Sequence, residues 1–175
     1  MLNIQIRPYK PEDAPALYEA ARESILDVYR WLPWCHPAYN INESKAWLAK
    51  QTQKRQEGTQ FAFAILDGAG NYLGGCGLNQ IDRKQKIANL GYWVRSSAMG
   101  QGVAVKAVKL LARWGFENTD LIRFEIKCAV ENMRSQRVAE KAGAIREGIR
   151  KSCLEIHGKK HDAVVFMVEK NKSAA

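Results

Sequence analysis

The sequence predicts one mixed α/β domain with a mostly antiparallel central sheet flanked by helices. Its 175 residues are 46% hydrophobic and 26% charged, which suits a single domain with a sizeable core and excludes global disorder. Along the chain the hydrophobic period alternates between helical and strand spacing. Residues 60–94 carry the pattern of an antiparallel meander. We place the domain at residues 1–170 and expect a disordered tail at 171–175.

The chain begins with a short strand followed by a long helix. Ile4, Ile6 and Pro8 alternate as in a strand. Residues 11–32 have the helical pattern, and Pro11 with two acidic residues after it suits a helix N-terminus. The apolar positions at helical spacing are Leu17, Ala20, Ala21, Ile25 and Val28.

A loop and a second helix follow. Residues 31–39 hold two prolines and three aromatic side chains, so the first helix ends there. Residues 42–58 are predicted as the second helix, with Asn42 as its N-cap and Gly58 at its end.

Three strands are predicted for the meander, at residues 61–66, 72–82 and 86–94, with a turn rich in Gly and Asn at 67–71. Residues 95–119 then begin as a glycine-bearing loop and continue as an amphipathic helix. The side chains that we expect to face inward from this helix are Val105, Val108, Leu111, Ala112 and Phe116.

The last third contains strands around one more helix. Residues 122–130 are predicted as a buried strand. Asn132 caps a helix that stops at Gly143. Residues 144–170 form two strands joined around His157 and the glycine after it.

The net charge is +9 and is concentrated in the second half of the chain. Residues 1–104 hold 12 basic and 9 acidic side chains, whereas residues 105–160 hold 13 basic and 7 acidic ones. This excess favours an anionic partner, which is a nucleic acid, an acidic protein or a phosphate-rich cofactor. No apolar run approaches the roughly 20 residues of a membrane helix. The first residues also lack the apolar region of a secretory signal.

The four cysteines indicate a reducing compartment. None has the CxxC spacing of a zinc or redox motif. Three of them, Cys76, Cys128 and Cys153, lie in apolar runs. We therefore expect buried free thiols, a cytoplasmic location and no metal site.

The loop before the helix of residues 95–119 is a candidate anion site, because it contains Gly100, Gln101 and Gly102. Glycines let the backbone approach a ligand closely, and the first N–H groups of a helix have no intrahelical partner. A Walker A loop needs Gly-Lys-Ser/Thr where this chain continues with valine and alanine, and the dinucleotide fingerprint needs glycine at Val105. ATP and NAD are therefore poor matches. A tight turn without a ligand is an equally good interpretation of this motif alone.

A second feature is the start of the helix at Asn132. Asn132 and Ser135 are three residues apart and share one face of that helix. Taken alone, this pair is interpreted more simply as an N-cap and a surface serine.

The two features, in this order, resemble the GNAT acyl-CoA N-acyltransferases, and within them the RimJ/RimL type of ribosomal-protein N-terminal acetyltransferase. The resemblance covers nearly the whole chain. It includes IQIRPYKPEDA, WLPW, GYWV followed by GQGVA, RFEIKCAVEN, NMRSQRVAEKAGA and the hairpin around GKKHD. The family loop usually begins with Arg or Gln where this chain has Met99, and an aromatic residue usually stands where it has Ala144. The resemblance implies a single GNAT domain that uses acetyl-CoA as co-substrate, without a metal.

The resemblance also implies residue roles. The loop would hold the pyrophosphate of coenzyme A, and the backbone of Trp93 and Val94 would pair with the pantetheine arm. Asn132 would fix the arm near the thioester, Ser135 would lie near the sulfur, and Arg137 would reach a phosphate. The implied cofactor-binding residues are Trp93, Val94, Met99, Gly100, Gln101, Gly102, Val103, Ala104, Asn132, Ser135 and Arg137.

The implied reaction is direct attack of a neutral amine on the acetyl thioester. Ser135 would donate a proton to the leaving thiolate, and the N–H of Val94 would donate to the oxyanion. Glu155 is our first candidate for the base and His36 the second, although an outward-facing strand residue and a loop histidine are simpler interpretations. The predicted acceptor-binding residues are Trp31, Trp34, His36 and Tyr39. Aromatic side chains of this kind suit a core under a loop equally well.

We expect the acceptor to be the N-terminal α-amine of a protein, and the basic chain favours an acidic N-terminus. One alternative is a small-molecule amine, such as a polyamine, an amino acid or an aminoglycoside. Another is a non-enzymatic module that binds nucleic acid, which is disfavoured because the basic residues form no groove-reading motif. Members of this group often pair, so the expectations include a homodimer.

Overall fold

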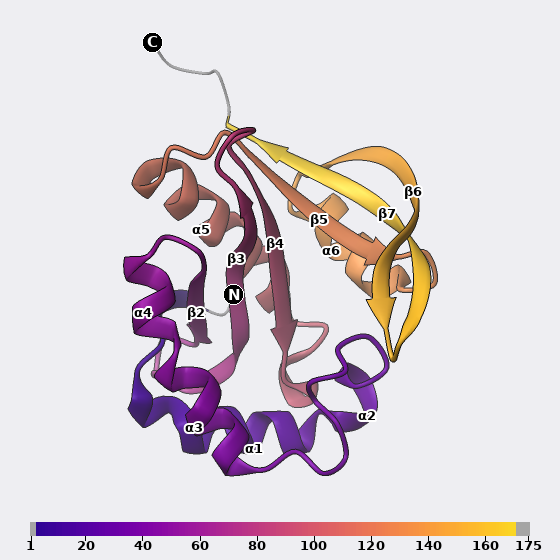
Figure 1. The fold of residues 1–175 in the computed structure, drawn as a ribbon. Coiled ribbons are helices and arrows are strands. Elements are labelled where there is room, and N and C mark those ends of the chain that lie inside the picture. The colour runs from indigo at the N-terminus through magenta and orange to yellow at the C-terminus, as the bar shows by residue number, and fades with distance from the viewer. Residues whose placement is uncertain (1–2, 171–175) are drawn as a thin grey trace.

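A seven-stranded sheet forms the centre of residues 3–170, the part of the chain that the computed structural model describes (Figure 1). The strands lie in the order β1-β2-β3-β4-β5-β7-β6. Their bounds are Gln5–Pro8 for β1, Phe61–Leu66 for β2, Tyr72–Asp82 for β3, Ile87–Val94 for β4, Arg123–Ala129 for β5, Ile145–Ile156 for β6 and Lys159–Glu169 for β7.

The sheet opens between β4 and β5. These two strands are the parallel pair of the sheet, and the other neighbouring strands are antiparallel. Residues 87–89 of β4 pair with residues 123–125 of β5, whereas β5 continues along β7 as far as Ala129. Beyond Asn89 the two strands diverge (Figure 1). The edge of β4 over residues 90–94 is therefore unpaired on the β5 side.

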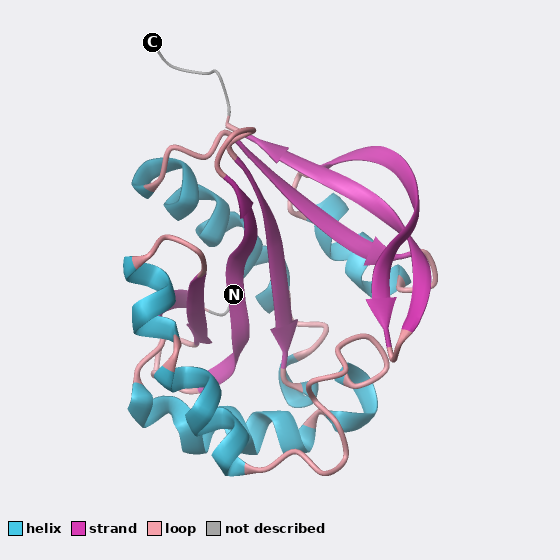
Figure 2. Ribbon diagram, viewed as in Figure 1, coloured by secondary structure: helices cyan, strands magenta, loops and turns pink. Residues whose placement is uncertain are grey.

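Helices lie on both faces of the sheet (Figure 2). The helices α1, α3 and α4 pack on one face near β2 and β3, and α5 and α6 pack on the other. Their bounds are Ala14–Glu23 for α1, Ile25–Val28 for α2, Ile41–Ala49 for α3, Gln51–Gln56 for α4, Val103–Asn118 for α5 and Met133–Lys141 for α6, with 3-10 turns η1 at Pro11–Asp13 and η2 at Ser96–Ala98.

Successive side chains of a strand point to opposite faces of the sheet, so one strand contributes to a hydrophobic cluster on each face. On β2, Phe63 and Ile65 join the larger cluster beneath α5, while Ala64 between them faces α1. The larger cluster also holds Phe124 and Phe166, both fully buried. The bulk of the apolar burial therefore lies on the face that carries α5 and α6.

The predicted order of strands and helices and the mostly antiparallel sheet are confirmed, but the first long helix is interrupted. It ends at Glu23 and resumes as α2 after Ser24. The Ser24 hydroxyl donates to Ala20 O at 2.6 Å and accepts from Ser96 N at 2.9 Å. A serine that bonds backbone groups in this way competes with the helical ladder, which explains the break.

The start of the second long helix differs from the prediction by two residues. Asn42 is not the N-cap, because α3 begins at Ile41 and Asn40 caps it. The Asn40 side chain accepts from Asn42 N at 3.0 Å, and the Glu43 carboxylate accepts from Asn40 N at 3.0 Å. This capping box fixes the helix start more strongly than a single polar residue does. Residue 50 then divides the predicted helix into α3 and α4.

Burial also differs from the prediction at a few positions. On α5, Val105 and Phe116 are only half-buried, and Val103 and Ala107 take the fully buried positions. Among the cysteines, Cys153 is half-buried and Cys35 is fully buried. The predicted tail at 171–175 lies outside the described residues. Of the helices within residues 3–170, none has the length and apolar character needed to cross a membrane.

Candidate active site

The turn between β4 and α5 is open to its surroundings. Gly100 and Gly102 have φ of +77° and +78°, a left-handed conformation that residues with a Cβ adopt only with strain. A Cβ atom placed on either glycine would meet no atom within 4 Å. Conformation, and not packing, therefore requires the glycines, and the backbone of the turn can be approached from outside.

The helix α5 begins with unused donors. Gly102 is its N-cap and supplies no side chain, and the first backbone bond runs from Lys106 N to Gly102 O at 3.1 Å. The N–H groups of Val103, Ala104 and Val105 precede this bond and have no intrahelical acceptor. Together with the positive end of the helix dipole, they make the turn suited to an anion.

The segment that leads into the turn is tied to α1. Arg95 forms an ion pair with Glu23, and Ser97 N donates to the same carboxylate at 2.8 Å. The hydrogen bond from Arg95 lowers the pKa of Glu23 to about 2, and the Ser97 bond adds to this shift. A second link runs from the Ser96 hydroxyl to Asp27 on α2, at 2.6 Å. The turn is therefore held in place before any ligand binds.

The N–H of Val94 is directed into the opening between β4 and β5. Arg95 N donates to Leu73 O at 2.8 Å, and Val94 lies opposite Gly74 in the β3–β4 register. Bonded and non-bonded pairs alternate along an antiparallel ladder, so Val94 belongs to a non-bonded pair and its N–H is directed away from β3. By the same rule Trp93 belongs to a hydrogen-bonded pair, so its backbone N–H and C=O face β3 and not the opening.

The start of α6 faces the opening from the other side. Asn132 Oδ1 accepts from Ser135 N at 3.1 Å, which confirms Asn132 as the N-cap. The Ser135 Oγ lies 2.9 Å from the hydroxyl of Tyr92 on β4 and 3.2 Å from the Sγ of Cys128 on β5. Ser135 therefore occupies the place where β4, β5 and α6 meet.

One basic side chain of α6 lies beside the turn. Arg134 donates from Nη1 to Asp27 Oδ1 at 3.2 Å and lies 3.9 Å from the Sδ of Met99. Arg137, one helical turn further on, is exposed. Gln101 folds back onto the turn, and its Nε2 donates to Ser97 O at 3.0 Å.

Three of the four predicted acceptor residues gather beside β4. Trp34 packs edge-to-face against Trp93, with 5.2 Å between ring centroids, and against Tyr39 at 5.5 Å. The His36 ring meets Tyr39 at 6.0 Å. Tyr39 is buried and its hydroxyl pairs with Ser44 Oγ at 2.8 Å. Its ring is therefore fixed in place and forms a rigid packing surface for Trp34. We call Trp34, His36, Tyr39 and Trp93 the aromatic cluster.

Trp31 lies elsewhere, in a pocket of about 280 Å³ between the loop after α2 and the β6–β7 hairpin. The pocket is lined by Arg30, Trp31, Glu131, Ile156, His157, Lys159 and His161. Arg30 covers the Trp31 ring at 4.7 Å, and His157 Nε2 is 2.9 Å from Tyr29 O. Because Glu131 immediately precedes Asn132, this pocket lies next to the cap of α6.

The two candidate bases differ in their surroundings. Glu155 is 61% exposed and paired with Lys160 at 3.2 Å, and its neighbour Ile156 is the residue that faces the pocket. Adjacent strand residues point to opposite faces, so Glu155 is directed away from the pocket. His36 instead belongs to the aromatic cluster, and its Nε2 lies 2.9 Å from Glu43 Oε2. That hydrogen bond lowers the pKa of Glu43.

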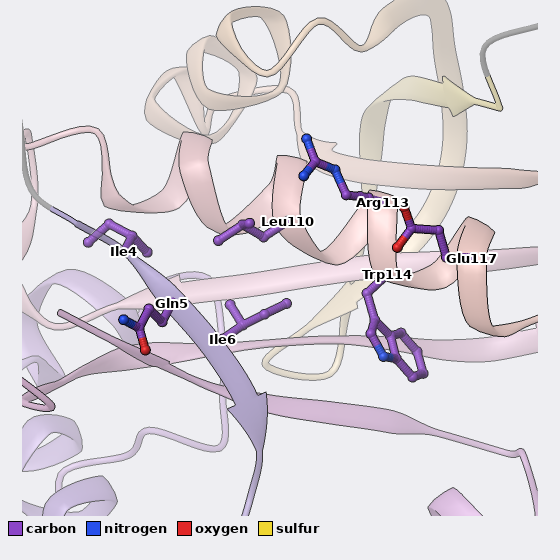
Figure 3. A pocket seen from close by; sticks show the side chains of 7 residues that line it. All are labelled: Ile4, Gln5, Ile6, Leu110, Arg113, Trp114 and Glu117. Atoms are coloured by element: carbon purple, nitrogen blue, oxygen red, sulfur yellow. The ribbon is translucent and has the colours of Figure 1, made fainter. Parts of the chain in front are cut away.

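A larger pocket, of about 390 Å³, lies at the far edge of the sheet between β1 and the second half of α5 (Figure 3). The lining residues are Ile4, Gln5, Ile6, Leu110, Arg113, Trp114 and Glu117. Leu110 is already two helical turns past Val103, roughly 10 Å along the axis. The volume of this pocket is therefore no guide to the chemistry, because the glycine turn and Ser135 lie at the other end of α5.

Sequence reasoning missed Tyr92, Cys128 and Arg134 as parts of this site. A signal existed for Tyr92, which alternates with Leu90 and Val94 and therefore faces inward. A buried phenol needs a hydrogen-bond partner, but the partner here lies 43 residues away in the sequence. Only the fold could identify it.

Comparison with known proteins gives one family. The profile of the acetyltransferase (GNAT) domain matches residues 3–145. The ribosomal-protein-serine acetyltransferase of Escherichia coli (strain K12) is 38% identical over 146 residues, which cover 83% of this chain and 81% of that protein.

Solved structures show the same fold. RimL, described as a ribosomal L7/L12 alpha-N-protein acetyltransferase in complex with coenzyme A, has a TM-score of 0.86 at 24% identity, covering 95% of this chain and 94% of that one. RimJ of Mycobacterium smegmatis, in complex with CoA-disulfide, has a TM-score of 0.88 at 22% identity, covering 99% of this chain and 88% of that one.

Proposed function

The chain belongs to the GNAT acetyltransferase family, and from this premise we propose that it moves the acetyl group of acetyl-CoA to the N-terminal α-amine of a protein. The observation that carries the proposal is the arrangement around the opening between β4 and β5. A turn with free N–H donors lies at the start of α5, and the cap and serine of α6 lie across from it.

The turn suits the pyrophosphate of coenzyme A. The backbone from Met99 to Ala104 would bind it through the free donors at the start of α5. The pantetheine arm would then run along the unpaired edge of β4, where Val94 offers its N–H. Asn132 would donate to the arm from Nδ2, which its capping bond does not use. Arg137 would contact a phosphate from the surface of α6.

The chemistry needs no covalent intermediate on the enzyme. The amine nitrogen attacks the acetyl carbon, the N–C bond forms, and the C–S bond breaks with its electron pair on sulfur. The amine loses one proton to a base or to water, and the sulfur gains one from the Ser135 hydroxyl, which recovers it from water. The N–H of Val94 would stabilise the oxyanion. Holding both substrates together contributes several kcal/mol, roughly 7 or more.

An α-amine suits this site better than a lysine side chain. At neutral pH about 14% of an α-amine with a pKa near 7.8 is uncharged, against about 0.04% of a lysine amine with a pKa near 10.4. A weak base is therefore enough for an α-amine. His36 is better placed than Glu155 to be that base, because it lies in the aromatic cluster beside β4 and Glu43 orients it.

The surroundings of the opening favour an acidic N-terminus as acceptor. Arg30, Lys159 and His161 line the 280 Å³ pocket next to the cap of α6, with Glu131 as its acidic member. The curated relative from Escherichia coli acts on a serine of a ribosomal protein, according to its name. We therefore propose a protein that begins with serine and continues with acidic residues. The homodimer and the cytoplasmic location stay predictions.

The test compares three acceptors at equal concentration, with acetyl-CoA and a thiol-release assay. The first is a peptide that begins with a free serine followed by acidic residues. The second is the same peptide with a formylated N-terminus and one internal lysine. The third is spermidine. We expect the free peptide to react at least about tenfold faster than the other two, since a much larger fraction of its amine is uncharged and its charge is complementary.

Mass spectrometry of the product must place the acetyl group on the α-nitrogen. Spermidine turnover equal to that of the free peptide would refute the α-amine and favour a small-molecule enzyme. A calorimetric titration with acetyl-CoA that gives no heat and no shift of the unfolding temperature would refute the coenzyme site itself.

A further inference from the structure

Tyr92 lies on β4 at the opening between β4 and β5, and its hydroxyl reaches the start of α6. It lies three residues beyond Asn89, where the pairing of β4 with β5 ends. Its ring is partly buried and packs against the larger hydrophobic cluster between the sheet and α5. Its hydroxyl lies 2.9 Å from Ser135 Oγ and 3.0 Å from Ser135 O. One phenol therefore contacts both the side chain and the backbone of the same serine.

We propose that Tyr92 is a positioning residue for acetyl transfer, whose hydroxyl holds the Ser135 side chain in the rotamer that faces the departing sulfur. The inference rests on the proposed function, because it assigns Tyr92 a role through Ser135. Tyr92 itself need not touch either substrate.

The reason lies in the freedom of a serine side chain. A hydroxymethyl group has three staggered rotamers, and its hydrogen can rotate about the C–O bond. Ser135 is only half-buried, so packing alone does not select one rotamer. The contact with Tyr92 selects it, because the phenol is anchored in the core and is also bonded to the carbonyl of the same residue.

The second neighbour of Ser135 leaves the serine hydrogen free. Cys128 Sγ lies 3.2 Å from Ser135 Oγ, on β5. Burial raises the pKa of Tyr92 above its ordinary value and raises the pKa of Cys128 to about 11, so both groups keep their hydrogens at neutral pH. Cys128 can donate to one lone pair of the serine oxygen. The single phenol hydrogen of Tyr92 is shared between Ser135 O and Ser135 Oγ, and when it turns to Oγ the Ser135 hydrogen is left for a third acceptor.

Tyr92 is not the acid in this arrangement. Its single hydroxyl hydrogen is committed to the oxygens of Ser135, so it is not offered to the departing sulfur. The phenol therefore keeps its proton throughout the reaction and acts by hydrogen bonding alone. Proton transfer to the sulfur still passes through Ser135, as in the proposed reaction.

The experiment is a double-mutant cycle on Tyr92→Phe and Ser135→Ala, with kcat and KM for acetyl-CoA measured in each variant. Phenylalanine keeps the packing of the ring and removes only the hydroxyl. We expect Tyr92→Phe to lower kcat by about three- to tenfold, the range of one lost hydrogen bond, with KM changed less than about twofold. In the Ser135→Ala background, Tyr92→Phe should cause no further fall.

A matched control is Tyr9→Phe. Tyr9 is also partly buried and its hydroxyl also pairs with another hydroxyl, that of Tyr72, in the cluster beneath α1 and α3. It should change the unfolding temperature without changing kcat by more than about twofold. A folded Tyr92→Phe protein with wild-type kcat would overturn the inference, and so would an equal fall in both backgrounds.

Cys128→Ala tests the inference without depending on Tyr92→Phe. If Tyr92 holds the serine, removal of the thiol should leave kcat within about twofold of the wild type, since one of two weak contacts is lost. A larger fall in a folded Cys128→Ala protein would assign the positioning to the thiol and overturn the role of Tyr92. Failure of the proposed function would give a different result. The wild-type protein would then acetylate no α-amine, or Ser135→Ala would have the same kcat as the wild type.

Discussion

Single residues decide how the candidate site can work, and Gly102 is the clearest case. Its φ of +78° favours glycine, and its surroundings are open. An added methyl group would therefore strain the backbone without clashing with neighbouring atoms. The methyl group would instead project into the open space beside the free N–H groups of α5, where the proposed coenzyme pyrophosphate would bind.

We predict that Gly102→Ala lowers the free energy of unfolding by about 1–2 kcal/mol and weakens acetyl-CoA binding by about tenfold. Gly70→Ala is the matched control. Gly70 has φ of +87° and open surroundings as well, but it lies in the turn between β2 and β3. It should lose similar stability and keep its acetyl-CoA affinity, measured by denaturation and calorimetry. Equal loss of affinity in both variants would contradict a binding role for the turn.

At the scale of an element, α5 shows how packing overrides intrinsic preference. Glycine within a helix is normally about 1 kcal/mol less favourable than alanine, so Gly115→Ala should stabilise the chain on helix propensity alone. The structure indicates the opposite. A Cβ on Gly115 would lie 2.5 Å from Phe124 Cζ and 2.9 Å from Leu78 Cδ1.

We therefore predict that Gly115→Ala lowers the free energy of unfolding by about 1–2 kcal/mol, because overpacking outweighs the propensity gain. Denaturant titration measures this directly. In a Phe124→Leu background the same substitution should cost less, since the clashing ring atom is gone. A stabilising effect of Gly115→Ala in the otherwise unchanged protein would show that the helix moves freely against the sheet.

The link between α1 and the turn gives a pH dependence. The pKa of Glu23 is lowered from 4.5 to about 2 by Arg95 and Ser97. A lowered pKa contributes stability above the unfolded value, and this contribution disappears as the pH falls from about 5 toward 2.

We predict that Glu23→Gln is less stable than the wild type at neutral pH and that the difference vanishes in this acidic range. Free energies of unfolding measured in parallel for the two proteins test it. Because the Glu23 side chain is 29% exposed and solvent screens the ion pair, the difference should be at most about 1 kcal/mol. A difference that persists unchanged below about pH 3 would contradict the role of the ion pair.

The positive charge of the whole molecule is unevenly distributed along the chain. Most of the net charge comes from residues 105–160, which include α6 and all but the first two residues of α5, the helix that begins at the glycine turn. Arg137 is exposed on α6, while Arg113 lies at the far edge of the sheet in the larger pocket. The two residues therefore separate local contact from net charge.

We predict that Arg137→Glu weakens acetyl-CoA binding by about fivefold or more at low salt, and that this loss shrinks as salt screens the interaction. Arg113→Glu makes the same change in net charge and should alter affinity by less than about twofold. Titrations at two ionic strengths check both. Equal losses would mean that only the overall charge of the protein matters.

Local patterns were enough to predict most elements. Strand alternation placed β2 and β3 at their observed bounds, and the glycine turn followed by an amphipathic helix predicted the start of α5. The cap at Asn132 was also predictable, since Asn before a helix has one dominant interpretation. These features depend on interactions within a few residues, which is why one sequence suffices.

Other features needed the assembled fold. The break at Ser24 depends on Ser96, which lies 72 residues away, and the grouping of Trp34 with Trp93 separates both from Trp31. The orientation of Glu155 away from the pocket depends on the register of the β6–β7 hairpin. None of these contacts leaves a local signal.

The sequence by itself determined the order of helices and strands, the glycine turn and its family resemblance, because periodicity, capping and backbone conformation act over short stretches of chain. Tertiary structure alone decided that β4 and β5 part beyond Asn89 and that Tyr92, Cys128 and Ser135 meet in the space between them. That meeting joins residues from two strands and a helix, and the distances between such side chains are set by the packing of the whole core, which no local pattern encodes.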